Sequence, residues 1–326
     1  MKYKKVARIE EQISTVGIGC WNFGGDWDTS DDRNAIEIVH AAIDRGVNLF
    51  DVAPVYGWFH AERVLGRALK GGLREKVLIA SKCGLTWNDK HQTANDLSRK
   101  NILQEIDVSL ERLQTDYIDI YQLHWPDPNT PIEETAETLA EIKKAGKIRH
   151  IGLSNFSQRD METFMAIVDV DEQQGLYNMF ERNTDSYHGI PLEYKTEKEM
   201  LPNVRKYGQA FLPYSPLFQG LLAGKFRNGL NLSERDIRNE NPKLHPGRIE
   251  VYYEGYKRVQ AIADDIGKPI VQVALNWMRQ KPEVTSIING VSSLRQLETN
   301  VASTEWDISD EDMARIDAAI AEFEDM

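Results

Sequence analysis

The sequence predicts a closed parallel (β/α)8 barrel, a TIM barrel of the α/β class, and three observations favour this fold. Short apolar runs rich in β-branched residues alternate with amphipathic stretches along most of the chain. Strands that alternate with helices build a parallel sheet. Eight such repeats occur without a shift in composition, and 326 residues suit one barrel. We therefore expect residues 1–326 to form a single domain.

The eight strands are predicted from apolar runs, most of which end in polar residues. They cover residues 16–21, 47–51, 77–82, 117–124, 148–155, 170–174, 209–215 and 284–290. The helices between them are predicted at residues 31–45, 60–70, 98–113, 131–145, 157–167, 196–207, 251–266 and 293–302. The first helix is typical, because acidic residues open it, apolar residues recur at helical spacing and Gly46 follows its end.

Three segments add to the eight repeats. Residues 4–14, "KKVARIEEQIS", predict an N-terminal β-hairpin that caps the floor of the barrel. Residues 309–322 predict an extra C-terminal helix, with Ser309 as its N-cap. A long polar segment at about 218–250 interrupts the seventh repeat, and loops of this length inside compact domains usually have a function.

Composition excludes several classes of protein. The net charge is −12 with both signs interspersed, whereas a nucleic-acid-binding protein needs a clustered basic face. Apolar runs are all shorter than the ~20 residues that span a bilayer, and the N-terminus lacks the apolar core of a signal peptide. Cys20 and Cys83 provide neither a disulfide framework nor metal-ligand spacing. We expect a cytoplasmic protein without nucleic-acid or membrane partners.

Many of the predicted strands end in polar residues, which the barrel brings to one rim. They are Asp51, Ser81, Lys82, His124, Ser154, Asn155, Gln174 and Ser215. The C-terminal ends of barrel strands carry the active site in this fold. Any one of these residues alone is more often a local hydrogen-bonding residue. Together, and with Tyr56 just after the second strand, they predict a catalytic pocket.

Five segments resemble signature segments of the aldo-keto reductase superfamily. They are "GVNLFDVAPVYG", "LIASKCG", "IYQLHWPD", "IGLSNFS" and "PYSPLFQGLLAGKF". The resemblance runs from about residue 3 to about residue 305, and is nearest to bacterial NADPH-dependent members that act on sugars and small aldehydes. It implies a nucleotide that lies extended across the C-terminal rim, with the long loop at about 218–250 covering it.

The resemblance places a catalytic tetrad on Asp51, Tyr56, Lys82 and His124. Hydride transfer to a carbonyl carbon builds negative charge on the oxygen, so a proton donor is needed there. A free phenol titrates near ~10 and is a weak acid at neutral pH. We expect the Lys82 ammonium to lower the pKa of Tyr56, Asp51 to hold Lys82, and neutral His124 to orient the carbonyl.

The cofactor contacts also come from the resemblance, because "VGIGCWNFGG" does not have the spacing of a dinucleotide fingerprint. Ser154, Asn155 and Gln174 match the residues around the nicotinamide carboxamide, and Tyr214 matches the aromatic that stacks on the ring. The full set is Gly19, Cys20, Trp21, Asp51, Ser154, Asn155, Gln174, Tyr214, Ser215, Pro216, Leu217, Gln219, Gly220, Lys225, Arg238, Gly290, Ser292, Gln296 and Asn300.

Two positions depart from the pattern of the superfamily. Cys20 stands where members usually have threonine, and Ser292 stands where some relatives carry a basic residue. Arg295 or Arg238 would then supply the positive charge for the adenosine 2′-phosphate. NADP(H) is favoured over NAD(H) on this basis.

The segment after Tyr56 reads "YGWFHAE" and differs from the "YGxGxSE" common in the superfamily. Predicted substrate contacts are Trp21, Tyr56, Trp58, Trp87, His124 and Trp125, and Trp27 also follows a strand end. Such an aromatic mouth suits sugar stacking and hydrophobic aldehydes equally. For any single rim tryptophan, packing within a lid is the alternative to a substrate contact. The seven histidines are scattered and predict no metal site.

The predicted function is NAD(P)H-dependent, reversible hydride transfer to an aldehyde, ketone or sugar carbonyl, with tyrosine as general acid and no metal. One alternative is a sugar or inositol dehydrogenase working in the oxidative direction. Another is a non-catalytic redox sensor that binds the nucleotide, as the related barrel subunits of potassium channels do. The presence of His124 favours turnover. The sequence does not predict the oligomeric state.

Overall fold

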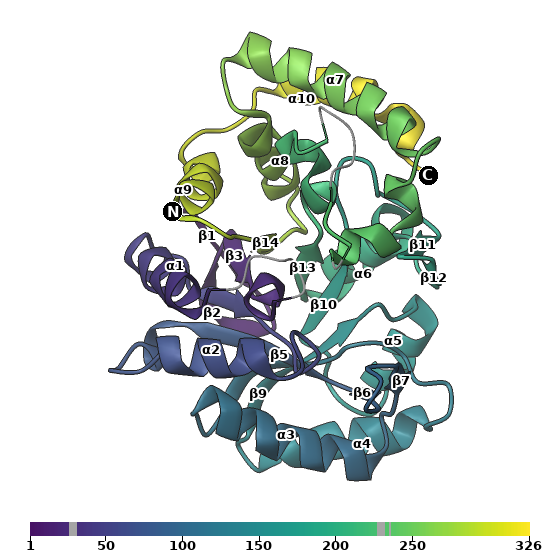
Figure 1. Ribbon diagram of the computed structural model, residues 1–326. Coiled ribbons are helices and arrows are strands. Elements are labelled where there is room, and N and C mark those ends of the chain that lie inside the picture. Colours follow the sequence, from purple (N-terminus) through teal and green to yellow (C-terminus); the bar gives the residue numbers. More distant parts are fainter. Residues whose placement is uncertain (26–30, 227–231, 235) are drawn as a thin grey trace.

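The computed structural model describes residues 1–25, 31–226, 232–234 and 236–326, and it shows eight parallel strands that form a barrel (Figure 1). In chain order they are β3 (Val16–Gly19), β4 (Leu49–Asp51), β5 (Leu78–Cys83), β8 (Ile118–Leu123), β9 (Ile148–Ser154), β10 (Glu172–Leu176), β13 (Ala210–Tyr214) and β14 (Ile287–Gly290). Thr285 N donates to Phe211 O at 2.9 Å, which joins the two ends of the sheet. The predicted barrel and its strands are confirmed.

The interior of the barrel changes from apolar to polar toward the C-terminal ends of the strands. Its apolar layer consists of Ile9, Ile13, Leu49, Leu78, Ala80, Ile120, Ala210, Leu212 and Ile288. Side chains alternate in direction along a strand, so the residues two positions further on point into the same interior. These residues include Asp51, Lys82 and Gln122, which are all buried. Strand periodicity thus carries charged groups to the inside of the rim.

The helices cover the outside of the barrel (Figure 1). They are α1 (Asp32–Asp44), α2 (His60–Ala68), α3 (Arg99–Leu113), α4 (Ile132–Lys144), α5 (Gln158–Met165), α6 (Leu201–Tyr207), α7 (Ile249–Ile266), α8 (Ile270–Arg279), α9 (Leu294–Ala302) and α10 (Asp310–Ala319). Several begin at residues whose side chains accept a backbone N–H, as N-caps do: Asp31, Ser98, Ser157, Ser293 and Ser309.

The helix α8 was not predicted from the sequence. Most of its residues are buried, and its polar residues Gln272, Asn276 and Arg279 recur at helical spacing, but the expected repeat has one helix between two strands, a place that α7 already takes. The predicted helix at 251–266 is α7, which packs beside α10 at the top of Figure 1. Two hairpins were also not predicted: β6 (Leu85–Trp87) with β7 (Thr93–Asn95), and β11 (Ser186–Tyr187) with β12 (Ile190–Pro191).

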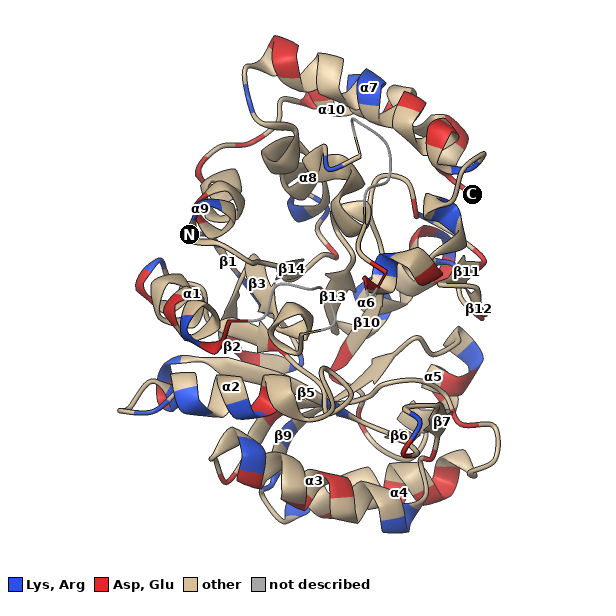
Figure 2. Cartoon of the chain, viewed as in Figure 1, with Lys and Arg blue, Asp and Glu red and all other residues tan. Residues whose placement is uncertain are grey.

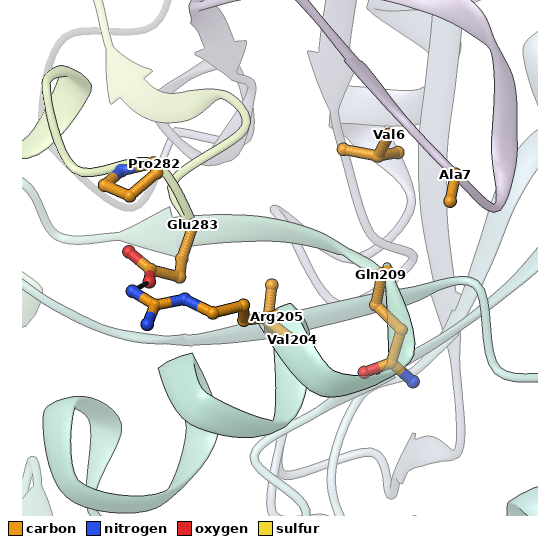
Figure 3. Close-up of a pocket in the computed structure, with 8 residues that line it drawn as sticks. Val6, Ala7, Val204, Arg205, Gln209, Pro282 and Glu283 are labelled. Atoms are coloured by element: carbon orange, nitrogen blue, oxygen red, sulfur yellow. Dashed lines mark hydrogen bonds and ion pairs between the residues drawn. The ribbon is translucent and has the colours of Figure 1, made fainter.

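The N-terminal hairpin closes the floor of the barrel, as predicted. It consists of β1 (Tyr3–Val6) and β2 (Ile9–Ser14), which pair antiparallel. Lys4 Nζ donates to the carbonyl oxygens of Arg279, Lys281 and Val284 at 2.9, 2.8 and 2.6 Å, which ties the hairpin to the end of α8. A pocket of about 160 Å³ also lies at this floor (Figure 3). It is lined by Val6, Ala7, Val204, Arg205, Gly208, Gln209, Pro282 and Glu283.

Charged residues of both signs are interspersed along the outer helices (Figure 2). None of the helices in the described part of the chain has the length and hydropathy of a membrane span.

Candidate active site

Asp51 and Lys82 form a buried ion pair at the C-terminal rim of the barrel. Asp51 is the last residue of β4, and Lys82 lies near the end of the adjacent strand β5. Lys82 Nζ donates to Asp51 Oδ2 at 2.7 Å and to Val52 O at 3.2 Å. Lys82 is 0% exposed and Asp51 3%. Because a buried charge is costly without a partner, this geometry fixes the ammonium in one place.

Tyr56 lies in the turns that follow β4, and its ring faces the ion pair. Lys82 Nζ is 5.2 Å from the centre of the Tyr56 ring. The ring of His124, just after β8, meets the Tyr56 ring edge-on at 6.0 Å. The Trp21 ring stacks on Tyr56 at 5.6 Å. The structure therefore brings the four predicted tetrad residues together, with Trp21 beside them.

Two glycines allow Trp21 to reach Tyr56. A Cβ atom on Gly24 would lie 2.5 Å from Gly57 N, and one on Gly57 would lie 2.0 Å from Gly24 O. Gly57 also has a φ of +59°, which other residues adopt at a cost. The two backbone segments can approach this closely only without side chains, and their contact presses the loop after β3 against the loop after β4.

Burial decides the protonation of the two titratable rings. It raises the pKa of Tyr56 well above the usual value for a phenol, and the Asp51 carboxylate raises it further. Burial and the Lys82 charge hold the pKa of His124 well below its usual value. Both rings are therefore neutral near pH 7. Burial and the Asp51 carboxylate set this direction for the protein without nucleotide, and the lowering of the Tyr56 pKa by Lys82 stays a prediction.

A chain of hydrogen bonds connects the ion pair to the predicted carboxamide-binding residues. Gln174 Nε2 donates to Asp51 Oδ2 at 2.8 Å, and Ser154 Oγ lies 3.5 Å from Gln174 Oε1. Asn155 Nδ2 donates to Ser154 Oγ at 3.1 Å and to the carbonyl oxygen of His124 at 3.2 Å. These residues come from the ends of β9 and β10, so the strand order explains why they meet.

Asn155 is held in place by two tyrosines. Its Oδ1 accepts from Tyr214 Oη at 2.8 Å and from Tyr194 Oη at 3.0 Å. Its φ of 66° is unusual for a residue with a side chain, and such backbone strain is concentrated at functional sites. Tyr194 was not predicted, because it lies outside any strand end and belongs to no recognised motif. Tyr214, predicted to stack on the nicotinamide, also meets the Tyr187 ring edge-on at 5.1 Å.

The comparisons with known proteins agree with this geometry. The aldo/keto reductase family model matches residues 15–321. The chain belongs to the aldo/keto reductase family. It is 36% identical to the aldo-keto reductase YhdN of Bacillus subtilis, covering 98% of this chain and 94% of that protein.

Two further relatives match over nearly their whole length. The chain is 32% identical to the NADH-specific methylglyoxal reductase of Escherichia coli, over 96% of each protein. The solved structure of the glycerol dehydrogenase AKR11B4 from Gluconobacter oxydans is 32% identical, with a TM-score of 0.87 over 98% of this chain and 95% of that one. The protein is accordingly an oxidoreductase of a family that binds a nicotinamide cofactor.

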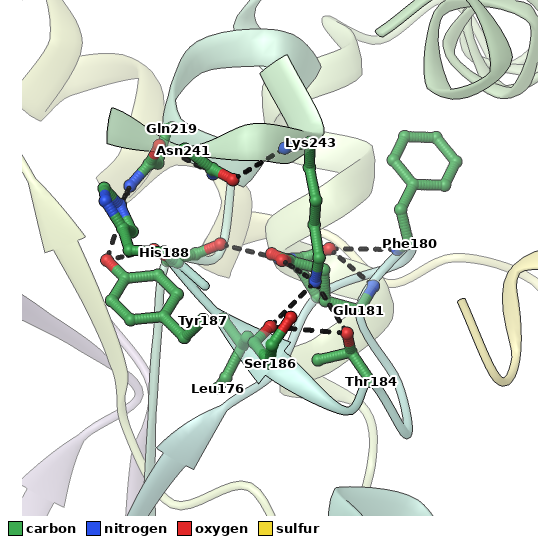
Figure 4. A network of polar contacts seen from close by, with 12 residues as sticks. Leu176, Phe180, Glu181, Thr184, Ser186, Tyr187, His188, Gln219, Asn241 and Lys243 are labelled. Atoms are coloured by element: carbon green, nitrogen blue, oxygen red, sulfur yellow. Dashed lines mark hydrogen bonds and ion pairs between the residues drawn. The ribbon is translucent and has the colours of Figure 1, made fainter. Parts of the chain in front are cut away.

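The segment after β13 is the part of this aldo/keto reductase predicted to wrap the pyrophosphate. It begins with Ser215, Pro216 and Leu217 and has an irregular backbone, with φ of 52° at Gln219 and 107° at Gly220. Gln219 makes hydrogen bonds to residues far along the chain (Figure 4). Its Nε2 contacts His188 Nε2, and its Oε1 accepts from Asn241 Nδ2 at 3.1 Å.

Lys243 lies in the C-terminal part of the segment after β13 and holds it through three polar contacts (Figure 4). Its Nζ lies 2.8 Å from Glu181 Oε1, 2.6 Å from Thr184 Oγ1 and 3.0 Å from Ser186 O. Lys243 is 5% exposed and Glu181 2%. Sequence reasoning missed this buried pair, because neither residue lies at a strand end. The predicted loop at about 218–250 is thus tied to the β11–β12 hairpin; its residues 227–231 and 235 lie outside the described ones.

The donors in this segment suit a pyrophosphate. Lys225 and Arg238 lie close enough for Arg238 to lower the pKa of Lys225, although burial lowers it more. Arg238 Nε donates to Asp236 Oδ1 at 2.8 Å, and its Nη1 lies 3.5 Å from Gln219 O. Two cations beside one carboxylate leave net positive charge, which fits the phosphates of a nicotinamide nucleotide.

The predicted adenosine end lies at the start of α9. Ser293 caps this helix, and Gln296 Oε1 accepts from Ser292 N at 2.8 Å and from Ser292 Oγ at 3.0 Å. Asn300 is buried one turn further on, and Gly290 is exposed at the end of β14 with open space around its Cα. These residues share one edge of the rim. Gly19, the last residue of β3, pairs in register with Gly290. Cys20 follows it, is buried and donates its N–H to Asp51 O at 2.8 Å.

The rim tryptophans pack mainly against other protein groups. The Trp58 ring stacks on His91 at 4.1 Å and lies 5.1 Å from Trp87, which is carried by the β6–β7 hairpin. Trp125 is partly buried and packs against the cluster of buried residues that extends from Leu176 to Phe323. Trp58 and Trp87 thus pack against each other at the rim and Trp21 contacts the tetrad, while their contacts with a substrate stay predictions. Trp27 lies outside the described residues. Across the described part of the chain, no group of three or more His, Cys, Asp or Glu side chains is placed to hold a metal ion.

Proposed function

We propose that this aldo/keto reductase transfers hydride reversibly between a nicotinamide nucleotide and an aldehyde, ketone or sugar carbonyl. One observation carries the proposal: the neutral Tyr56 phenol lies beside a buried Lys82–Asp51 pair and faces the neutral His124 ring. This arrangement offers a proton donor, a fixed positive charge and a second hydrogen-bond donor at one point on the rim.

Each side chain has a separate task in the proposed reaction. The bound nucleotide supplies the hydride, and the residues of the chain manage the charge that develops on oxygen. His124, neutral because of its lowered pKa, donates a hydrogen bond that orients the carbonyl. Tyr56 gives up its phenolic proton to that oxygen. Lys82 then stabilises the phenolate electrostatically, and Asp51 holds the ammonium in position. The proposal assigns no step to a metal ion.

We further propose that NADPH is preferred over NADH. Lys225 and Arg238 give the nucleotide-covering segment a positive charge, and Arg295 lies in the first turn of α9 beside Ser292. One relative, from Escherichia coli, is an NADH-specific enzyme, so the preference varies among similar chains. The ratio of the two Kd values measures the preference. Tighter binding of NADPH is expected, and equal or tighter binding of NADH would contradict it.

The substrate is proposed to be a small carbonyl compound or sugar, in keeping with relatives named for methylglyoxal and glycerol. Purified protein should be screened with both nucleotides against aldehydes, inososes and pentoses, and against the corresponding alcohols in reverse. Oxidation of the reduced nucleotide by at least one group of carbonyl compounds is expected. No turnover across the panel, with tight nucleotide binding retained, would instead favour a nucleotide-binding sensor.

A further inference from the structure

Glu172 is a buried acid inside the barrel to which the proposed reaction assigns no task. It is the first residue of β10 and is 0% exposed. In the parallel register it lies between Gly152 on β9 and Ala210 on β13. Two small neighbours leave room for its carboxyl group within the barrel. Gln174, two residues further along the same strand, is the residue that donates to Asp51.

The carboxyl group of Glu172 meets the amide of Gln122 across Gly152. Gln122 lies on β8 and pairs in register with Gly152. Its Nε2 donates to Glu172 Oε2 at 3.0 Å. A Cβ atom at residue 152 would lie 2.1 Å from Glu172 Oε2 and 2.8 Å from Gln122 Cγ. Glycine at this position therefore creates the space in which the two side chains touch.

The remaining oxygen atom of each group is buried and has no hydrogen-bond partner among the described residues. These atoms are Glu172 Oε1 and Gln122 Oε1. If the carboxyl group were ionised, both atoms would be acceptors, and two unsatisfied acceptors in a protein interior are costly. A proton on Glu172 Oε1 supplies the donor that Gln122 Oε1 needs. The acid and the amide then form a two-point pair in which each donates one hydrogen bond.

We propose that Glu172 is a neutral carboxylic acid whose O–H donates a hydrogen bond to Gln122 Oε1, and that this pair positions Lys82. Gln122 lies directly beside Lys82 in the register of β5 and β8. The Glu172–Gln122 pair therefore lies on the β8 side of the Lys82 ammonium, whereas Asp51 lies on its β4 side. Glu172 is a positioning residue, since it acts through its neighbours and is not assigned a contact with substrate.

The charges around Glu172 agree with a neutral acid. Burial raises the pKa of Glu172 well above its usual value, although the hydrogen bond from Gln122 lowers it. The carboxylates of Asp51 on β4 and of Asp171 just before β10 raise it further, and Lys82 on β5 lowers it. Asp51 already neutralises Lys82 at 2.7 Å. An ionised Glu172 would place a second anion near Lys82 and draw the ammonium away from its position beside Tyr56. That the place of Lys82 beside Tyr56 matters for turnover rests on the proposed function.

Infrared difference spectroscopy of the full-length protein near pH 7 tests the neutral acid directly. The wild type minus E172Q spectrum should contain the carbonyl stretch of a buried, protonated carboxylic acid. D171N is the matched control: Asp171 is also buried and adjacent, but its pKa is lowered, and Lys143 Nζ binds it at 2.9 Å. Its difference spectrum should show loss of a carboxylate band instead. A carboxylate band in the E172Q difference would overturn the proposal.

Kinetics then test the positioning role. E172D withdraws the carboxyl group from Gln122, so a loss of roughly tenfold or more in kcat is expected from misplacement of Lys82. E172Q keeps the shape and the neutral charge and should restore the larger part of kcat. Equal kcat for E172D and E172Q would overturn the positioning role. If E172D does not fold, Q122M serves instead: it removes the acceptor, and the acid carbonyl band should shift, whereas an unshifted band would contradict the pair.

These measurements separate the present inference from the proposed function. The infrared band is recorded without substrate, so it reports on Glu172 even if no carbonyl compound is turned over. A failed substrate screen with the acid band present would reject the reaction and leave the neutral pair standing. Turnover with a carboxylate band at Glu172 would reject the pair and leave the reaction standing.

Discussion

Lys82 Nζ lies 2.7 Å from Asp51 Oδ2 and 5.2 Å from the centre of the Tyr56 ring. One ammonium therefore joins a carboxylate at the end of β4 to a phenol in the turns that follow it. Both members of the ion pair are buried, so neither charge can be stabilised by water. The stability of the fold and the chemistry of the rim depend on the same contact.

Replacing Asp51 by asparagine should destabilise the protein strongly. D51N leaves the Lys82 ammonium buried without its counter-charge, and breaking a buried pair in this way costs about 3–5 kcal/mol. The free energy of unfolding in urea measures this cost. E254Q is the control, because the Glu254–Lys257 pair is 2.6 Å long but more than half exposed, with side-chain exposures of 60% and 51%. It should cost about 0.5 kcal/mol or less. Similar losses for the two variants would contradict a tightly coupled buried pair.

Gly57 should be needed both for stability and for turnover. G57A places a methyl group against the Gly24 carbonyl, which would push the Trp21 loop away from Tyr56. We expect a loss of stability of several kcal/mol together with a fall in kcat. G71A is the matched control: Gly71 also has positive φ, at +73°, but nothing lies within 4 Å of its added Cβ. It should cost only the backbone strain, about 1 kcal/mol, with kcat retained. A G57A enzyme with normal kcat would show that the Trp21–Tyr56 contact is dispensable.

Glu105 should make the stability of the fold fall as the pH rises toward neutrality. It lies on α3, where its carboxylate accepts from Gly84 N at 2.8 Å, and burial raises its pKa from the usual 4.5 to about 7. Between these two values the folded state binds more protons than the unfolded state, so stability decreases as pH increases. The protonated Glu105 carboxyl group contributes about 3 kcal/mol to the free energy of unfolding below pH 4.5. This contribution is lost above pH 7.

Unfolding of E105Q as a function of pH measures this contribution. Relative to the wild type, E105Q should gain stability between about pH 4.5 and pH 7, because it has no proton to lose. E111Q changes an exposed glutamate of the same helix and should follow the wild-type pH dependence. Parallel curves for the wild type and E105Q would show that Glu105 ionises as readily in the folded state as in the unfolded state.

Lys243 should slow the release of the nucleotide. If the segment after β13 covers the nucleotide, K243M frees that segment from Glu181 and raises both the dissociation rate and the Kd of the nucleotide. A loss of 1.4 kcal/mol in binding free energy corresponds to a rise of about tenfold. Stopped-flow fluorescence of nucleotide release gives the rate. K195M is the control, since Lys195 pairs with the largely exposed Asp185 near the same hairpin. Unchanged release from K243M would mean that the segment does not hold the nucleotide.

Much of the fold was predictable because parallel strands and amphipathic helices leave periodic patterns in the sequence. The eight barrel strands and the N-terminal hairpin were found in this way. The helix α8 was missed, although its polar residues recur at helical spacing, because an eightfold strand–helix repeat leads one to expect a single helix between two strands. The β6–β7 hairpin was missed because its strands are three residues long and mostly polar in β7, too short for an alternation to be recognised.

The site was predictable where it consists of strand ends and not where it depends on interior packing. Asp51 and His124 follow apolar runs directly, so topology alone brings them to one rim. Glu172 and Gln122 meet only because Gly152 has no side chain, and such a three-strand contact depends on register, which the sequence does not reveal. The raised pKa of Tyr56 likewise depends on burial and then on the nearby Asp51 carboxylate, and burial is known only once the fold is.

The most direct test of the account is the kcat of Y56F, measured with a carbonyl substrate found in the screen and with the Kd for the reduced nucleotide measured in parallel. Phenylalanine keeps the ring that stacks on Trp21 and removes the proton that the account assigns to catalysis. A loss of about 10²–10⁴-fold in kcat with a nearly unchanged Kd is the predicted result. A kcat near that of the wild type would contradict the assignment of Tyr56 as the proton donor.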